Sequence, residues 1–118
     1  MKPQLERIDT NSASSLQELC ADSPENFGFW VNASIGSDET EGSDDFQIFV
    51  CSREWLADES RPNAQLPEKY LLVEGGCDSF KLTDSLNAFL AECGGTNWSE
   101  VVEKISRIGK WEFEGYQR

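Results

Sequence analysis

The chain has 118 residues, a length that fits one domain, and 22 aspartate and glutamate residues against 10 lysine and arginine residues give it a formal net charge of −12. This charge argues against nucleic acid and anionic membrane surfaces as partners, because binding to either depends on basic side chains. The chain also has no histidine, which excludes Ser-His and Cys-His catalysis and histidine-bearing zinc sites.

Four cysteines, Cys20, Cys51, Cys77 and Cys93, are spaced too widely for a Cys-x-x-Cys pair or a zinc ribbon. The first residues turn polar without a hydrophobic signal-peptide core. Disulfides persist in oxidising compartments, so we expect a cytoplasmic protein whose cysteines are reduced and mostly buried. We expect neither a metal nor a cofactor.

Early in the chain, residues 5–9 alternate weakly and predict a first strand, and Ser15 with Glu18 predicts the start of a short helix. Residues 27–35 and 45–51 alternate clearly and are joined by a polar, glycine-containing loop, which predicts an antiparallel hairpin. One face of this hairpin is expected to carry its hydrophobic side chains, namely Phe27, Phe29, Val31, Ala33, Ile35, Phe46, Ile48 and Val50.

The second half of the chain predicts more helix than strand. Ser52 would cap a short helix carrying Trp55 and ending before Pro62, and residues 70–73 are hydrophobic on both faces, as in an interior strand. Helices are expected over residues 82–93 and from Asn97 to residue 108, followed by a strand over residues 111–114. The predicted fold is α+β: a single domain, residues 1–118, with an antiparallel or mixed sheet built on the central hairpin and helices packed mainly on one face.

The predicted core is one cluster made of Phe29, Val31, Ile48, Leu86, Phe89, Val102 and Ile105. Two side chains of the hairpin, Trp30 and Phe49, lie on the opposite face of their strands. If helices cover only the core face, these two form an exposed aromatic pair near the acidic loop, a composition typical of binding hot spots. Alternatively, a helix or a terminus covers that face as well.

The negative charge is concentrated in residues 36–60, which hold eight carboxylates against Arg53 alone. One interpretation is a solvated loop that aids solubility, and the other is a docking surface for a basic partner. A calcium loop fits poorly, because aligning Gly42 with the invariant EF-hand glycine puts Ile48 where a bidentate glutamate is needed. No catalytic constellation emerges from the sequence.

Several segments resemble the bacterial immunity protein 8 family in the same order along nearly the whole chain. They are Pro24-Glu25-Asn26-Phe27-Gly28-Phe29, Ile35-Gly36, Gly42 followed by Phe46, Val50-Cys51 before Trp55-Leu56-Ala57, and the run Ile105 to Glu114. The resemblance implies an immunity protein of a polymorphic toxin or contact-dependent inhibition system, which binds and neutralises a cognate toxin inside the cell.

The resulting hypothesis is a non-enzymatic, stoichiometric inhibitor whose acidic surface blocks a basic cleft, such as that of a nuclease-type toxin. The candidate toxin-binding residues are Asp38, Glu39, Glu41, Asp44, Asp45, Trp30 and Phe49. An adaptor or chaperone-like module of a secretion system is the alternative, and a small hydrolase with two carboxylates is a third. The sequence carries no signal of oligomeric state.

Overall fold

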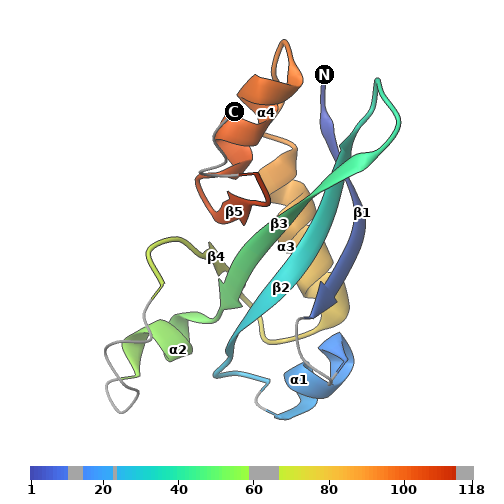
Figure 1. The fold of residues 1–118 in the computed structure, drawn as a ribbon. Helices are drawn as coiled ribbons and strands as arrows, with labels where there is room; N and C mark the ends of the chain where they lie inside the picture. Colours follow the sequence, from blue (N-terminus) through green and yellow to red (C-terminus); the bar gives the residue numbers. More distant parts are fainter. Residues whose placement is uncertain (11–14, 23, 59–66, 114–118) are drawn as a thin grey trace.

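The computed structural model describes residues 1–10, 15–22, 24–58 and 67–113, and it contains the predicted mixture of sheet and helices (Figure 1). The strands are β1 (Pro3–Thr10), β2 (Gly28–Ser37), β3 (Ser43–Cys51), β4 (Leu71–Leu72) and β5 (Gly109–Trp111). The helices are α1 (Leu16–Asp22), α2 (Arg53–Ala57), α3 (Ser79–Leu90) and α4 (Trp98–Ile105). The α+β prediction is confirmed.

The sheet is built on the predicted hairpin of β2 and β3. Its strand order is β1-β2-β3-β4, and β5 pairs with β3 as well. All pairs are antiparallel except β3 with β4, so the sheet is mixed. Within the hairpin, Val31 lies opposite Ile48 and Trp30 lies opposite Phe49, as the alternation of the two segments predicts.

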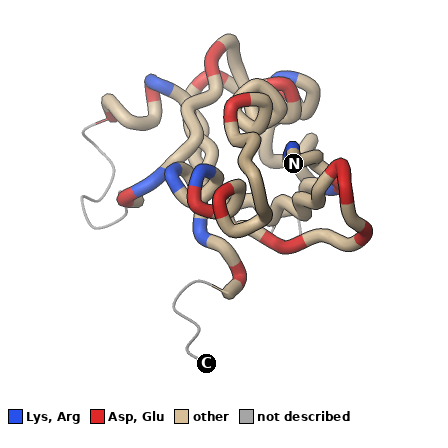
Figure 2. Tube along the Cα trace, turned by 90° about the horizontal axis from the view of Figure 1, so that it is seen from above, with Lys and Arg blue, Asp and Glu red and all other residues tan. Residues whose placement is uncertain are grey.

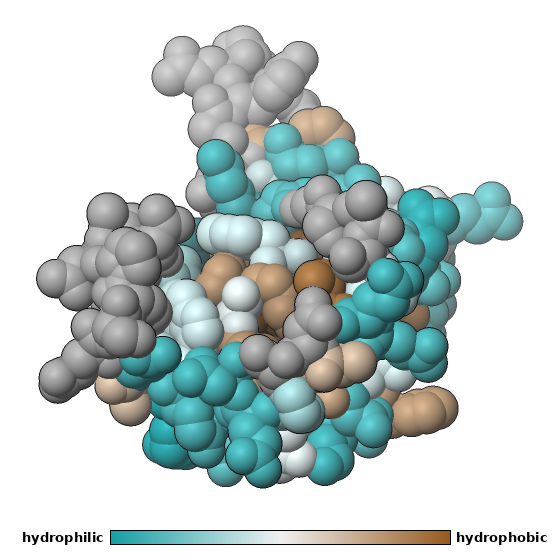
Figure 3. All heavy atoms as spheres, turned by 90° about the horizontal axis from the view of Figure 1, so that it is seen from below, coloured by the Kyte–Doolittle hydropathy of each residue, from teal (hydrophilic) through white to brown (hydrophobic). Residues whose placement is uncertain are grey.

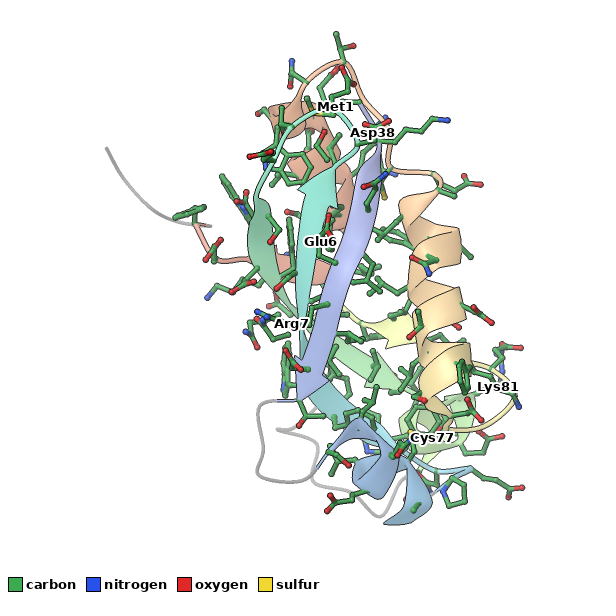
Figure 4. The ribbon with its side chains drawn as sticks, turned by 90° about the vertical axis from the view of Figure 1, so that its right-hand side faces the viewer. Met1, Glu6, Arg7, Asp38, Cys77 and Lys81 are labelled. Atoms are coloured by element: carbon green, nitrogen blue, oxygen red, sulfur yellow. A yellow bond between two sulfur atoms is a disulfide. The ribbon has the colours of Figure 1, made fainter. Side chains whose placement is uncertain are left out.

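The core lies between one face of the sheet and helices α3 and α4 (Figures 1 and 4). These two helices do not cover the other face. We call that other face the open face. Leu82, Leu86 and Leu90 recur every four residues along α3 and are buried. Of the predicted core residues, Val31, Ile48, Leu86, Val102 and Ile105 are buried, whereas Phe29 and Phe89 are half-buried at its margin.

Side chains at the helix starts explain where these helices begin. The Asp78 carboxylate accepts hydrogen bonds from the first-turn backbone of α3, and the Asn97 side chain accepts one from Glu100 N at 2.9 Å in α4. Ser52 Oγ accepts from Trp55 N at 3.2 Å and so caps α2. Each cap satisfies a backbone N–H that has no partner within its own helix.

Two predicted strands differ from the structure. The segment predicted as an interior strand forms only β4, which pairs with β3 alone within the described residues and lies at a sheet edge. It is short because Gly75 and Gly76 follow with positive φ angles and turn the chain away. The last strand begins at Gly109, earlier than predicted, and ends at Trp111. Pro62 and Glu114, which bounded two predicted elements, lie outside the described residues.

The prediction that all cysteines are reduced is wrong. Cys20 of α1 and Cys77, just before α3, form a disulfide with their Cα atoms 4.9 Å apart, while Cys51 and Cys93 are buried thiols (Figure 4). The bonded cysteines are 57 residues apart, so no local spacing indicated the pair. None of the described helices is long and apolar enough to cross a membrane.

Candidate functional site

The five carboxylates Asp38, Glu39, Glu41, Asp44 and Asp45, here called the tip carboxylates, surround the turn between β2 and β3. Gly42 has a φ of +90° in this turn, which a residue with a side chain rarely adopts. Gly36 lies opposite, where a Cβ atom would come within 2.7 Å of the Gly42 carbonyl oxygen. The turn is therefore tightly closed and holds the carboxylates at one end of the sheet.

Asp38 and Glu39 connect the turn to the start of β1. Asp38 Oδ1 accepts a hydrogen bond from Lys2 N at 2.8 Å, and Asp38 N donates to Lys2 O at 3.0 Å. The Glu39 carboxylate forms an ion pair with the Met1 amino group at 2.7 Å. Figure 4 shows Met1 and Asp38 close together at this end of the molecule. Both carboxylates nevertheless remain exposed.

Asp44 connects three elements. Its Oδ2 atom accepts hydrogen bonds from the indole N–H of Trp98, in α4, at 2.7 Å and from that of Trp111, in β5, at 3.0 Å. A carboxylate that accepts two such bonds is part of the fold, because its loss would leave two half-buried donors without this acceptor. The interpretation of this region as a solvated loop is therefore wrong for Asp44.

Asp45 points to the open face. Its Oδ1 atom accepts from Ser34 Oγ at 2.7 Å, and its backbone pairs with Glu112 through two hydrogen bonds of 2.9 and 3.0 Å. Within the described part of the chain, Glu41 is the one tip carboxylate without a hydrogen bond or ion pair. The tip thus presents Asp38, Glu39 and Glu41 to solvent, and Asp44 and Asp45 mainly hold neighbouring segments.

Trp30 and Phe49, the expected exposed pair, are in contact, but only Trp30 is exposed. Their rings meet edge to face with centroids 5.3 Å apart. Trp30 is 46% exposed, whereas Phe49 is only 6% exposed. Phe49 is covered because the Trp55 ring of α2 packs on its other side, with centroids 4.9 Å apart. Trp30, Phe49 and Trp55 form the aromatic cluster of the open face.

Gly28 makes room for this arrangement. A Cβ atom at Gly28 would lie 2.5 Å from a ring carbon of Trp55, so only glycine lets that indole lie against β2. Trp55 lies in the predicted short helix, but its contact with Phe49 was not predicted. The signal that could have found it is the glycine on the open face of an otherwise regular strand.

The candidate residues fall into two regions and do not form one patch. Trp30 and Asp38 are eight residues apart on or just beyond β2, which corresponds to about 26 Å along an extended strand. Seen from above, acidic residues follow the hairpin on one side, and several basic residues lie close together on the other (Figure 2). A partner that touches both regions must therefore span most of the open face.

Comparison with known proteins identifies the family. A family model described as Immunity protein 8 matches residues 4–116, nearly the whole chain. The chain belongs to the immunity protein 8 family. No curated protein and no solved structure matches it. The family suggests a binding role, so the two surface regions of this immunity protein are its functional candidates.

A hollow at the opposite end of this immunity protein tests the hydrolase alternative. Glu25, Glu54 and Glu74 line a space of about 350 Å³ beside α2, and all three side chains are exposed. Arg53 forms an ion pair with Glu74. From below, hydrophilic side chains surround a small hydrophobic patch (Figure 3). These carboxylates do not form the buried, opposed pair that acid–base hydrolysis would require.

The Cys93 thiol of the immunity protein gives no sign of reactivity. Burial raises the pKa of the Cys93 thiol, and the nearby Arg107 and Lys104 charges offset this only in part. The Cys93 sulfur donates to Phe89 O at 3.3 Å. A raised pKa keeps the thiol protonated, whereas a nucleophile must be a thiolate. Among the described residues, no cluster of cysteine and carboxylate side chains is arranged to hold a metal ion.

Proposed function

We propose that this protein is a single immunity domain that neutralises a cognate toxin by binding it in a stoichiometric complex, without catalysis. The observation that carries the proposal is the match to the immunity protein 8 family over residues 4–116. Its surface supports the same role: an exposed tryptophan on one end of the open face and exposed carboxylates at the other. Exposed aromatic and charged groups are typical of specific protein interfaces.

The exposed tip carboxylates favour a toxin with a basic surface, such as the cleft of a nuclease-type enzyme. Asp38, Glu39 and Glu41 project from one tight turn of a chain with a net charge of −12. Such a one-signed field speeds the encounter with a basic partner and can occupy the place of a phosphate backbone. Asp44 and Asp45 contribute to the same field but are held by internal hydrogen bonds.

We place this complex in the cytoplasm, where a toxin of a contact-dependent or polymorphic system would meet its inhibitor. The Cys20–Cys77 disulfide argues against a cytoplasmic location, since such bonds are rare in reducing compartments. Trapping of thiols in intact cells, followed by mass spectrometry, measures whether the bond exists where the protein works.

Co-expression tests the function. The C-terminal domain encoded by the gene next to the one for this chain is induced in cells with and without this protein, and growth is scored. We expect growth only when both are present, together with a stable complex on gel filtration. The matched control is an immunity protein of another family at equal expression. If this protein neither restores growth nor binds the toxin domain, the proposal is wrong.

A further inference from the structure

An open groove lies beside Trp30, where residues 67–69 lie next to β3 and β5. It has a volume of about 440 Å³ and is lined by Trp30, Gln47, residues 67–69 and residues 108–110. Hydrophobic surface predominates in the lining, which suits a bulky apolar side chain. We call it the Trp30 groove.

Trp30 forms a fixed wall of the groove. The edge-to-face contact with Phe49, itself packed on Trp55, positions its ring, yet 46% of the residue remains exposed. A large aromatic side chain that the fold leaves half exposed can still release water when a partner covers it. Tryptophan is also among the residues most enriched where binding energy concentrates.

The charge of the groove is opposite to that of the chain. Lys69 and Lys110 against Glu68 give its lining a formal charge of +1, whereas the whole chain carries −12. Lys69 Nζ donates to Ser106 O at 3.0 Å and to Gly109 O at 3.2 Å, so its charge is held at the end of α4. Lys110 is exposed on β5, opposite Gln47. A carboxylate is the group that this rim would attract.

We propose that the Trp30 groove binds a segment of the toxin in which a bulky apolar residue is adjacent to an acidic one. The apolar side chain packs between Trp30 and Ile108, and the carboxylate meets Lys110. This inference rests on the proposed function, because it names the surface through which the toxin is held. It also orients the toxin, since the groove requires an acidic segment and the tip carboxylates require a basic one about 26 Å away.

The test uses the toxin domain that wild-type protein neutralises in the co-expression experiment. Binding is measured for wild type and for Trp30→Ala, Trp30→Phe, Lys110→Glu and Phe80→Ala, after thermal unfolding has shown that each variant folds. Phe80 is the matched control, because it is 78% exposed on α3 and does not line the groove.

We expect Trp30→Ala to weaken binding at least about 30-fold and Trp30→Phe to recover part of the loss. Lys110→Glu should weaken binding about tenfold, and Phe80→Ala should change it less than twofold. If Trp30→Ala and Lys110→Glu bind like wild type while wild type still neutralises, the groove inference is wrong and the proposed function stands. If wild type itself neither binds nor rescues, the proposed function fails.

Analytical ultracentrifugation without toxin tests whether a second copy of this chain, instead of the toxin, occupies the Trp30 groove. We expect wild type and Trp30→Ala to sediment alike at every concentration. Self-association of wild type that Trp30→Ala abolishes would make the groove a contact between copies and would overturn the inference.

Discussion

At the tip end of the sheet, carboxylates hold separate segments together, whereas at the Trp30 end a disulfide and three aromatic rings in contact do so. Asp44 joins α4 and β5 through two indole N–H groups, and Asp38 joins the turn to β1. At the other end, Cys20–Cys77 joins α1 to the start of α3, and Trp55 covers Phe49. The comparison shows that residue type is a poor guide to free surface: most tip carboxylates already have a polar partner, while Trp30, although it contacts Phe49, is still 46% exposed.

The disulfide gives the largest expected effect on stability. The bonded cysteines are 57 residues apart, and on the chain-entropy model closing such a loop stabilises the folded state by about 4 kcal/mol. We therefore expect reduction, or Cys20→Ser with Cys77→Ser, to lower the free energy of unfolding by about this amount in urea titrations. Reductant should not affect the double serine variant. Identical unfolding of wild type with and without reductant would contradict the bond and remove this side of the comparison.

Substitution of Asp44 should have the next largest effect on the free energy of unfolding. Asp44→Ala removes the acceptor of two half-buried indole groups, and we expect it to lower the free energy of unfolding by about 1–3 kcal/mol. Glu41→Gln is the matched control at the same end and should change that free energy by less than about 0.5 kcal/mol. Equal losses in the two variants would show that the engaged and the solvent-facing carboxylates do not differ.

The exposed tip carboxylates should affect the rate of complex formation more than its lifetime. For Asp38→Asn combined with Glu39→Gln and Glu41→Gln, we expect association with the toxin to slow about tenfold at low salt, and the dissociation rate to stay near that of wild type. Trp30→Ala should act mainly on dissociation. Surface-binding kinetics at several salt concentrations separate the two, because steering is screened beyond a Debye length of about 10 Å at 0.1 M salt. Unchanged association in the triple variant would remove the tip from the toxin surface.

The smallest expected effect is that of Cys93 on the pH dependence of the free energy of unfolding. Burial raises the pKa of its thiol, so the folded protein holds this proton to higher pH than the unfolded chain does. Its contribution to stability is present below the ordinary thiol pKa of about 8.5 and is lost as pH rises through the raised value. We expect the free energy of unfolding to fall less steeply above pH 9 in Cys93→Ala than in wild type. Parallel curves would show that this thiol does not couple to folding.

Local pattern predicts much of this fold because its main elements carry their own signals. The alternation in residues 27–51 fixed which side chains of β2 and β3 face the core, and Asn97 with Glu100 marked the start of α4. Asp44 carries no such signal, since its partners Trp98 and Trp111 lie 54 and 67 residues further along. The same holds for the Trp30 groove, which is assembled from four segments that only the folded chain brings together.

The four tryptophans also make the molecule its own optical reporter. Trp98 and Trp111 share a carboxylate at the tip end, while Trp30 and Trp55 belong to the aromatic cluster at the other. Trp30 is the most exposed of the four, so its emission should shift to shorter wavelength when a partner covers it. A Trp30→Phe variant removes this signal and leaves Trp55, Trp98 and Trp111 as probes of unfolding. Intrinsic fluorescence can therefore follow events at each end of the sheet without any attached dye.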